Sequence, residues 1–126
     1  MFNALHISGS GLTVMRTWMD AVSDNIANIN TARTTDSEAF QARYVEAVAG
    51  EPGVAVGGIE LGDPAGRLVS QPDHPLADEN GMVRYPAIDL GDQMTMMMVA
   101  QRAYQANLSV IDRARDTYLA ALQIGR

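Results

Sequence analysis

Apolar residues recur in alternating steps of four and three at both ends of this chain, a spacing typical of a helix face that packs on another helix. In the C-terminal stretch, residues 89–126, only Gln101 and Arg115 interrupt the apolar stripe. Its members are Leu90, Met94, Met97, Gln101, Tyr104, Leu108, Ile111, Arg115, Tyr118 and Leu122. Between Asp92 and Ile124 the sequence has no glycine and no proline, so the pattern predicts one long helix.

The same spacing returns near the N-terminus, in a stripe whose only polar member is Ser8. The stripe consists of Leu5, Ser8, Leu12, Met15, Met19, Val22, Ile26 and Ile29. Gly9 and Gly11 lower the helix propensity at its start, so the helix signal is strong from about Leu12 to Ile29, and the turns before Leu12 are expected to need tertiary contacts to form. A polar residue in such a stripe can specify pairing, which makes Ser8, Gln101 and Arg115 candidates for fixing register or contacting another chain.

The two stripes have two interpretations. They could be the core faces of a compact helical domain, because periodicity alone does not distinguish that case from an extended helical pair. The predicted C-terminal helix would be about 50 Å long, far more than a small domain needs to cover its own core. The length therefore favours an extended pair in which each stripe faces another helix.

Between the two stretches, residues 32–88 have a different composition. The polar run from Asn30 to Glu38 predicts a loop, and prolines and glycines then separate short runs rich in β-branched residues. These runs predict three or four strands in one small sheet, at residues 41–48, 54–61, 67–70 and 82–85. The predicted fold class is α+β, with an N-terminal helix in residues 1–31, a loop and β-rich insert in 32–88, and a C-terminal helix in 89–126. Because a compact insert separates them, the two helices are predicted to run antiparallel with both termini at the same end.

Charge and composition exclude several classes of function. The net charge is −6 and all nine basic residues are arginine, so the chain has no basic patch of the kind that binds nucleic acid. The absence of cysteine excludes disulfides, thiolate metal sites and a cysteine nucleophile. No apolar run is long enough for a transmembrane helix, and no signal peptide is expected because glycines interrupt the first apolar segment. Any export would need another route.

The residues suited to catalysis are few. His6 and His74 are the only histidines, and His74 lies between two prolines that predict a rigid turn. Asp73, His74 and Asp78 can be pictured as metal ligands, but their spacing matches no recognised site. The methionines around Met97 suit flexible apolar packing. The sequence thus predicts no metal, no cofactor and no enzyme activity.

Two blocks of sequence resemble a known family. Asn25, Ile26, Ala27, Asn28, Asn30 and Thr31 resemble the signature of bacterial flagellar rod and hook proteins, the axial family. Residues 74–78, 80–83 and 86–89, Met94, and the run Arg102, Ala103, Tyr104, Gln105, Ala106 and Asn107 resemble the C-terminal half of the flagellar basal-body rod protein FlgC family. Met82, Ala87 and Gln93 depart from that pattern, standing where an aromatic residue, Asn and Glu are expected.

The resemblance implies a structural subunit of the proximal rod of the bacterial flagellum, needed for motility. It further implies export through the flagellar type III apparatus without a cleaved signal, and a location in the basal body, outside the cytoplasmic membrane. The implied partners are other rod proteins, copies of the same chain, the base of the rod and the export apparatus, with no nucleic acid and no membrane insertion. The alternative is a helical adaptor or chaperone-like binding module, since the stripes do not say whether the partner is a sibling or a stranger.

The motif residues also receive expected roles. Asn28 and Asn30 are expected to close the end of the first helix, because Asn tolerates the left-handed conformation found there. Tyr104 is expected in the seam with its hydroxyl near a polar partner, and Asn107 is expected to project off the seam toward a neighbour.

Overall fold

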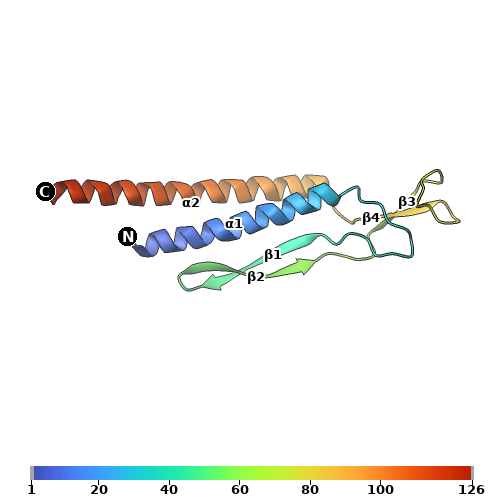
Figure 1. Ribbon diagram of the computed structural model, residues 1–126, viewed down its shortest axis with the longest axis horizontal. Coiled ribbons are helices and arrows are strands. Elements are labelled where there is room, and N and C mark those ends of the chain that lie inside the picture. The colour runs from blue at the N-terminus through green and yellow to red at the C-terminus, as the bar shows by residue number, and fades with distance from the viewer. Residues whose placement is uncertain (1, 126) are drawn as a thin grey trace.

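Two long antiparallel helices, with strands alongside and beyond them, make up the computed structural model, which describes residues 2–125 (Figure 1). The elements follow the order α1 (Phe2–Asn28), β1 (Arg43–Gly50), β2 (Gly53–Leu61), β3 (Arg67–Ser70), β4 (Met82–Tyr85) and α2 (Leu90–Ile124). The β1–β2 hairpin lies along α1, whereas β3 and β4 lie beyond the helix ends, opposite the two chain termini (Figure 1). The α+β class and the antiparallel helix pair are therefore confirmed.

Helix α1 begins at Phe2, so the turns before Leu12, which the glycines weaken, are helical as well. The tip of the β1–β2 hairpin contacts α1 at Ile7 and Ser10. There the Ser10 hydroxyl accepts a hydrogen bond from the Val54 backbone N–H at 3.1 Å and donates one to the Ile7 carbonyl at 2.7 Å. Tertiary contact thus stabilises turns whose glycines disfavour the helix on their own.

Helix α2 is one continuous helix of 35 residues, as the absence of internal proline predicts. The Asp89 side chain caps its start by accepting from the Asp92 backbone N–H at 2.9 Å, which satisfies one of the free donors of the first turn. At the other end the Gly125 N–H donates to the Ala121 carbonyl. Because α2 is longer than α1, it extends past its partner, and every residue from Arg115 to Gly125 is exposed.

The four predicted strands exist, but the prediction of a single sheet is wrong. β1 pairs with β2 and β3 pairs with β4, giving two separate two-stranded antiparallel sheets. The free edge of β4 is taken by the loop after α1, where the Arg33 and Arg84 backbones exchange two hydrogen bonds of 2.8 and 3.0 Å. The loop backbone, and not a hairpin strand, is therefore the neighbour of β4 at Arg84.

The buried core is thin. Its apolar members are small or medium in size and come mainly from α1 and the segments beside it: Val14, Ala21, Val22, Ala39, Ala42, Val83 and Ala100. Ser8, Asn25 and Gln93 are buried polar residues within it. Most of the larger apolar side chains of α2 therefore remain at the surface.

Candidate functional site

The face of α2 that packs on α1 is centred on small residues. Its buried and half-buried positions are Gln93, Met96, Met97, Ala100, Ala103, Tyr104, Asn107, Ile111 and Ala114. Opposite this face, a Cβ on Gly11 would lie 2.8 Å from Asn107 Nδ2, so the missing side chain of Gly11 lets Asn107 approach α1 closely. The covered face thus lies beside the stripe read from the sequence and coincides with it only in part.

The structure separates the predicted α2 stripe into two groups. Met97, Tyr104 and Ile111 are half-buried beside α1. The remaining members are exposed: Leu90, Met94, Gln101, Leu108, Arg115, Tyr118 and Leu122. Gln101 and Arg115 therefore do not set the register between α1 and α2, and their contact with another chain stays a prediction.

The predicted α1 stripe is covered along its length. Ser8 and Val22 are buried, and the other members are half-buried: Leu5, Leu12, Met15, Met19, Ile26 and Ile29. Gly11, Val14, Ala21 and Asn25 are buried as well, because α1 is packed between α2 and the β1–β2 hairpin. Most of the apolar surface left uncovered on the helical pair therefore belongs to α2.

One side of α2, next to its covered face, carries exposed apolar residues at its start, at Leu108 and near its end, with the exposed polar residues Gln101, Asp112 and Arg115 between them. We call these apolar residues the apolar flank of α2, which consists of Leu90, Met94, Met98, Leu108, Leu119 and Leu122. Met94 is 54% exposed and Leu122 is 51% exposed. Exposed apolar residues grouped on one side of an element mark an interaction site more often than chance exposure, so this flank is the candidate assembly surface.

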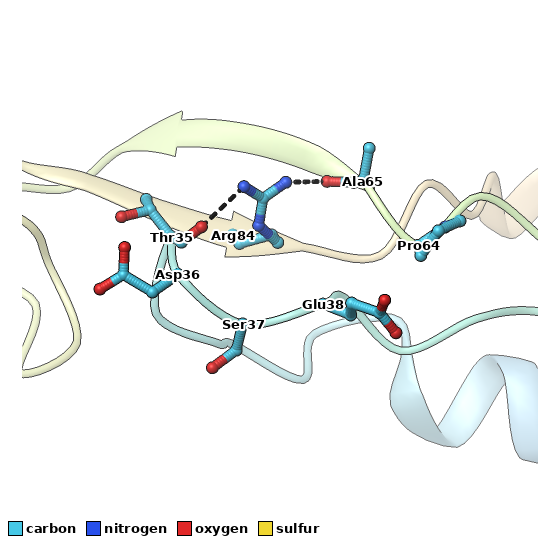
Figure 2. A pocket seen from close by; sticks show the side chains of 7 residues that line it. All are labelled: Thr35, Asp36, Ser37, Glu38, Pro64, Ala65 and Arg84. Carbon is cyan, nitrogen blue, oxygen red and sulfur yellow. Dashed lines mark hydrogen bonds between the residues drawn. The ribbon is translucent and has the colours of Figure 1, made fainter.

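Arg84 organises a polar pocket at the other end of the molecule. Figure 2 shows its guanidinium donating to the backbone carbonyls of Thr35, at 2.8 Å, and Ala65. The pocket is lined by Thr35, Asp36, Ser37, Glu38, Pro64, Ala65 and Arg84. Since both bonds go to backbone carbonyls, the arginine holds two loops against β4, which is a structural role.

The turn around His74 is built from local hydrogen bonds. The His74 Nδ1 atom accepts from the Leu76 backbone N–H at 3.1 Å. Asp78 Oδ1 accepts from the Asn80 and Met82 N–H groups, both at 2.9 Å, and Oδ2 accepts from the Thr35 hydroxyl at 3.1 Å. Across residues 2–125, no three His, Asp or Glu side chains are grouped so that they could hold a metal ion. Neither α1 nor α2 contains an apolar stretch long enough to cross a lipid bilayer.

Asp78 gives this turn a defined pH dependence. The bond from the Met82 N–H lowers the pKa of the Asp78 carboxyl, partial desolvation opposes that shift, and the bonds from Asn80 and Thr35 add to the lowering. A lowered folded-state pKa means that the carboxylate stabilises the fold fully above its usual value of 3.8, and that this stability is lost as the pH falls through the folded pKa.

We expect Asp78→Asn to weaken the turn at neutral pH and to flatten the acid side of the stability profile. The measurement is urea unfolding of both proteins from neutral pH to below pH 3.8. Glu79→Gln, at the exposed carboxylate next in sequence, is the matched control and should keep the acid-side slope. An unchanged slope in Asp78→Asn would contradict the assignment.

Comparison with known proteins identifies the family. A family model described as "Flagellar basal body rod FlgEFG protein C-terminal" matches residues 79–124, which include β4 and all of α2. The flagellar basal-body rod protein FlgC of Yersinia enterocolitica is 34% identical, over 100% of this chain and 98% of that protein. This chain belongs to the FlgC family of flagellar basal-body rod proteins. FlgC of Escherichia coli O6:H1 is 32% identical over the same shares of the two chains, and FlgC of Agrobacterium fabrum is 35% identical over 96% of this chain and 92% of the relative.

The FlgC-family motif at the end of α1 closes that helix with hydrogen bonds. Asn28 Nδ2 donates to the Asp24 carbonyl at 2.9 Å, and its Oδ1 accepts from the Thr31 hydroxyl at 3.1 Å. The expected left-handed Asn is absent, because every residue with positive φ within 2–125 is a glycine. The motif residues Ala27 and Asn30 are exposed. Arg33, which follows the motif in the loop after α1, is exposed as well.

The motif on α2 divides between the two sides of the helix. Arg102, Gln105 and Ala106 are exposed, and Tyr104 is half-buried. Asn107 lies in the seam against Gly11 and donates to the Ala103 carbonyl at 3.0 Å, so the expectation that it projects toward a neighbour is wrong. The close approach permitted by Gly11 draws this side chain inward.

Gln93, on the face of α2 that packs on α1, is a residue that the sequence pattern did not single out. It is 2% exposed and bonds the motif residue Asn25, which is 0% exposed. Gln93 lies one position before the predicted stripe residue Met94, so a pattern based on apolar residues passes over it. A usable signal was that Gln93 departs from the expected Glu within an otherwise matching block.

Proposed function

We propose that this chain acts in the proximal rod as a purely structural subunit, packing its terminal helices against neighbouring subunits of the drive shaft. Membership of the FlgC family makes it a component of the flagellar basal-body rod. The observation that carries the packing proposal is the apolar flank of α2, which the chain's own elements leave uncovered.

The length of α2 supports the same proposal. From Arg115 to Gly125 every residue is exposed, and this extension includes Tyr118, Leu119 and Leu122. Leu119 and Leu122 line an open pocket together with Gln123 and Gly125. Leu119 and Leu122 are about half exposed, so covering the rest of one such leucine would contribute about 0.8–1.5 kcal/mol. Several such contacts per subunit would therefore be needed to offset the cost of association.

The partners in this proposal are copies of the same chain and other rod proteins, with the base of the rod at one end. The resemblance to axial proteins implies that the chain reaches them through the flagellar type III export apparatus, without a cleaved signal. In the rod the chain acts by contact and not by catalysis, and the bonds of Arg84 and Asp78 to backbone groups and loop hydroxyls fit that role. The adaptor alternative receives no support from the relatives found.

A photo-crosslinking experiment tests the proposal. A photoreactive amino acid is placed at Met94 or at Leu122, both on the apolar flank, in a flagellated strain that lacks the native protein. Irradiation should join the chain to other rod subunits in purified basal bodies. The same probe at Ser109, an exposed position whose helix neighbours are the polar Gln105, Asp112 and Arg113 and the small Ala106, should give much less product.

The outcome also separates the two functional classes. A structural subunit is recovered in purified basal bodies and cross-links to several rod proteins. A chain found only in the soluble fraction, cross-linked to a single client, would be an adaptor and would contradict the proposal.

A further inference from the structure

Asn25 ties three elements of the fold together through one buried side chain. Its Nδ2 donates to Gln93 Oε1 on α2 at 2.9 Å and to the Arg43 carbonyl on β1 at 2.9 Å. Its Oδ1 accepts from the Arg43 backbone N–H at 2.8 Å. The Asn25 side-chain amide therefore bonds both the N–H and the C=O of Arg43 on β1. The backbone of a neighbouring strand would make the same pair of hydrogen bonds.

The contact between Gly11 and Asn107 belongs to the same alignment of the helices. Gly11 and Asn25 are two heptads apart on α1, and Gln93 and Asn107 are two heptads apart on α2. Since the helices are antiparallel and the spacing is the same on both, the Asn25–Gln93 contact and the Gly11–Asn107 contact form in the same register. Both contacts therefore specify one alignment of the helices, although they lie near opposite ends of the seam.

The apolar pattern alone does not select this register. Both stripes repeat every heptad, so sliding α2 by seven residues again places apolar positions in the seam. That slide would put Ala100 opposite Asn25 and Ala114 opposite Gly11. The Asn25 amide would then be buried without its acceptor on α2, and a buried unpaired donor is costly.

We propose that Asn25 and Gln93 form a register lock, which selects one antiparallel alignment of α1 and α2 and holds the β1–β2 hairpin at the same level. A buried polar pair of this kind contributes less to stability than an apolar pair of similar size and more to the choice among alignments. Both residues are positioning residues. The lock acts within a single chain, so it does not depend on the proposed function.

Cysteine cross-linking of the purified full-length chain reads the register directly, because the native sequence contains no cysteine. Gly11→Cys with Asn107→Cys reports the observed alignment. Gly11→Cys with Ala114→Cys, in a chain that also carries Asn107→Ala so that the new side chain at position 11 does not clash with Asn107, reports the alignment shifted by one heptad. In the otherwise unchanged chain we expect the first pair to form the disulfide and the second pair not to form it.

Adding Asn25→Leu together with Gln93→Leu should allow the shifted alignment. We expect the ratio of shifted to observed cross-link to rise about tenfold or more, which corresponds to about 1.4 kcal/mol. Gln93→Leu alone should raise it as well, because Asn25 then lacks its acceptor in both alignments. Gln93→Glu keeps an acceptor for Asn25 and should retain the observed cross-link only.

Asn28→Leu is the matched control, since Asn28 bonds only Asp24 and Thr31 near the end of α1. It should leave the ratio of cross-links unchanged even where it lowers stability. A Leu–Leu variant that still forms only the observed cross-link would overturn the proposal. Loss of both cross-links together with the helical circular dichroism signal would also overturn it, because the pair would then serve stability and not register.

Discussion

Replacing Leu122 with Asp is expected to abolish swimming while leaving the chain folded. Leu122 lies on the extension of α2 past α1 and is 51% exposed, so a carboxylate there remains in water in the isolated chain. In the assembled rod the same carboxylate would be buried in an apolar contact without a partner, which costs several kcal/mol. The measurements are swimming and rod completion in a strain that lacks the native protein, and circular dichroism of the purified variant.

Two control variants make this result specific. Ser109→Asp adds the same charge to α2 among mainly polar neighbours and should leave the strain motile, as should His74→Ala, which alters only a local turn. The secreted amount of each variant is measured alongside, because failed export would also stop swimming. A motile Leu122→Asp strain would contradict the assembly role of the apolar flank, and an immotile His74→Ala strain would point to a site in the β-rich insert.

The largest loss of stability is expected from Gly66→Ala. Gly66 has φ of +59°, a conformation that costs an L-residue about 1–2 kcal/mol. A Cβ there would also clash with the Tyr85 carbonyl oxygen and lie 2.6 Å from the Ala39 Cβ, so β4 or the Ala39 segment must move. Adding about 1–3 kcal/mol for overpacking, we expect a loss of roughly 2–5 kcal/mol, measured by urea unfolding.

Gly9→Ala is the matched control for this substitution. Gly9 lies inside α1, and a Cβ at that position would meet no atom within 4 Å. Alanine should stabilise the helix there by about 0.5–1 kcal/mol through its higher helix propensity. Equal changes for the two variants would show that the backbone conformation and packing around Gly66 do not matter.

Much of this fold could be read from local sequence. The helical spacing at the two ends predicted two helices, and the compact stretch between them predicted their antiparallel pairing. Strands β3 and β4 have the predicted bounds, because a glycine or proline lies close to each end of these short runs and limits the length of the strand. The family was also visible, since the motifs around Asn25 and Tyr104 are contiguous in sequence.

Three features depended on contacts between distant segments. The turns of α1 before Leu12 are helical despite their glycines, and the hairpin tip contacts them at Ile7 and Ser10. The β strands form two sheets, and the Arg33 backbone pairs with β4 at Arg84 on the edge away from β3. Neither partner is close in sequence to the element it affects, so no local pattern predicts either contact.

The candidate assembly surface shows the same division. Spacing determined that α2 has an apolar side, because a 3.6-residue period places residues three and four apart on one face whatever the tertiary structure. Spacing did not determine which edge of that side meets α1. The tertiary structure decided it by placing small and polar residues, Gly11, Ala100, Asn107 and the Asn25–Gln93 pair, in the seam. Close helix approach favours small side chains and a buried amide requires its partner, so the larger residues of α2 remain on the outside, available to neighbouring subunits.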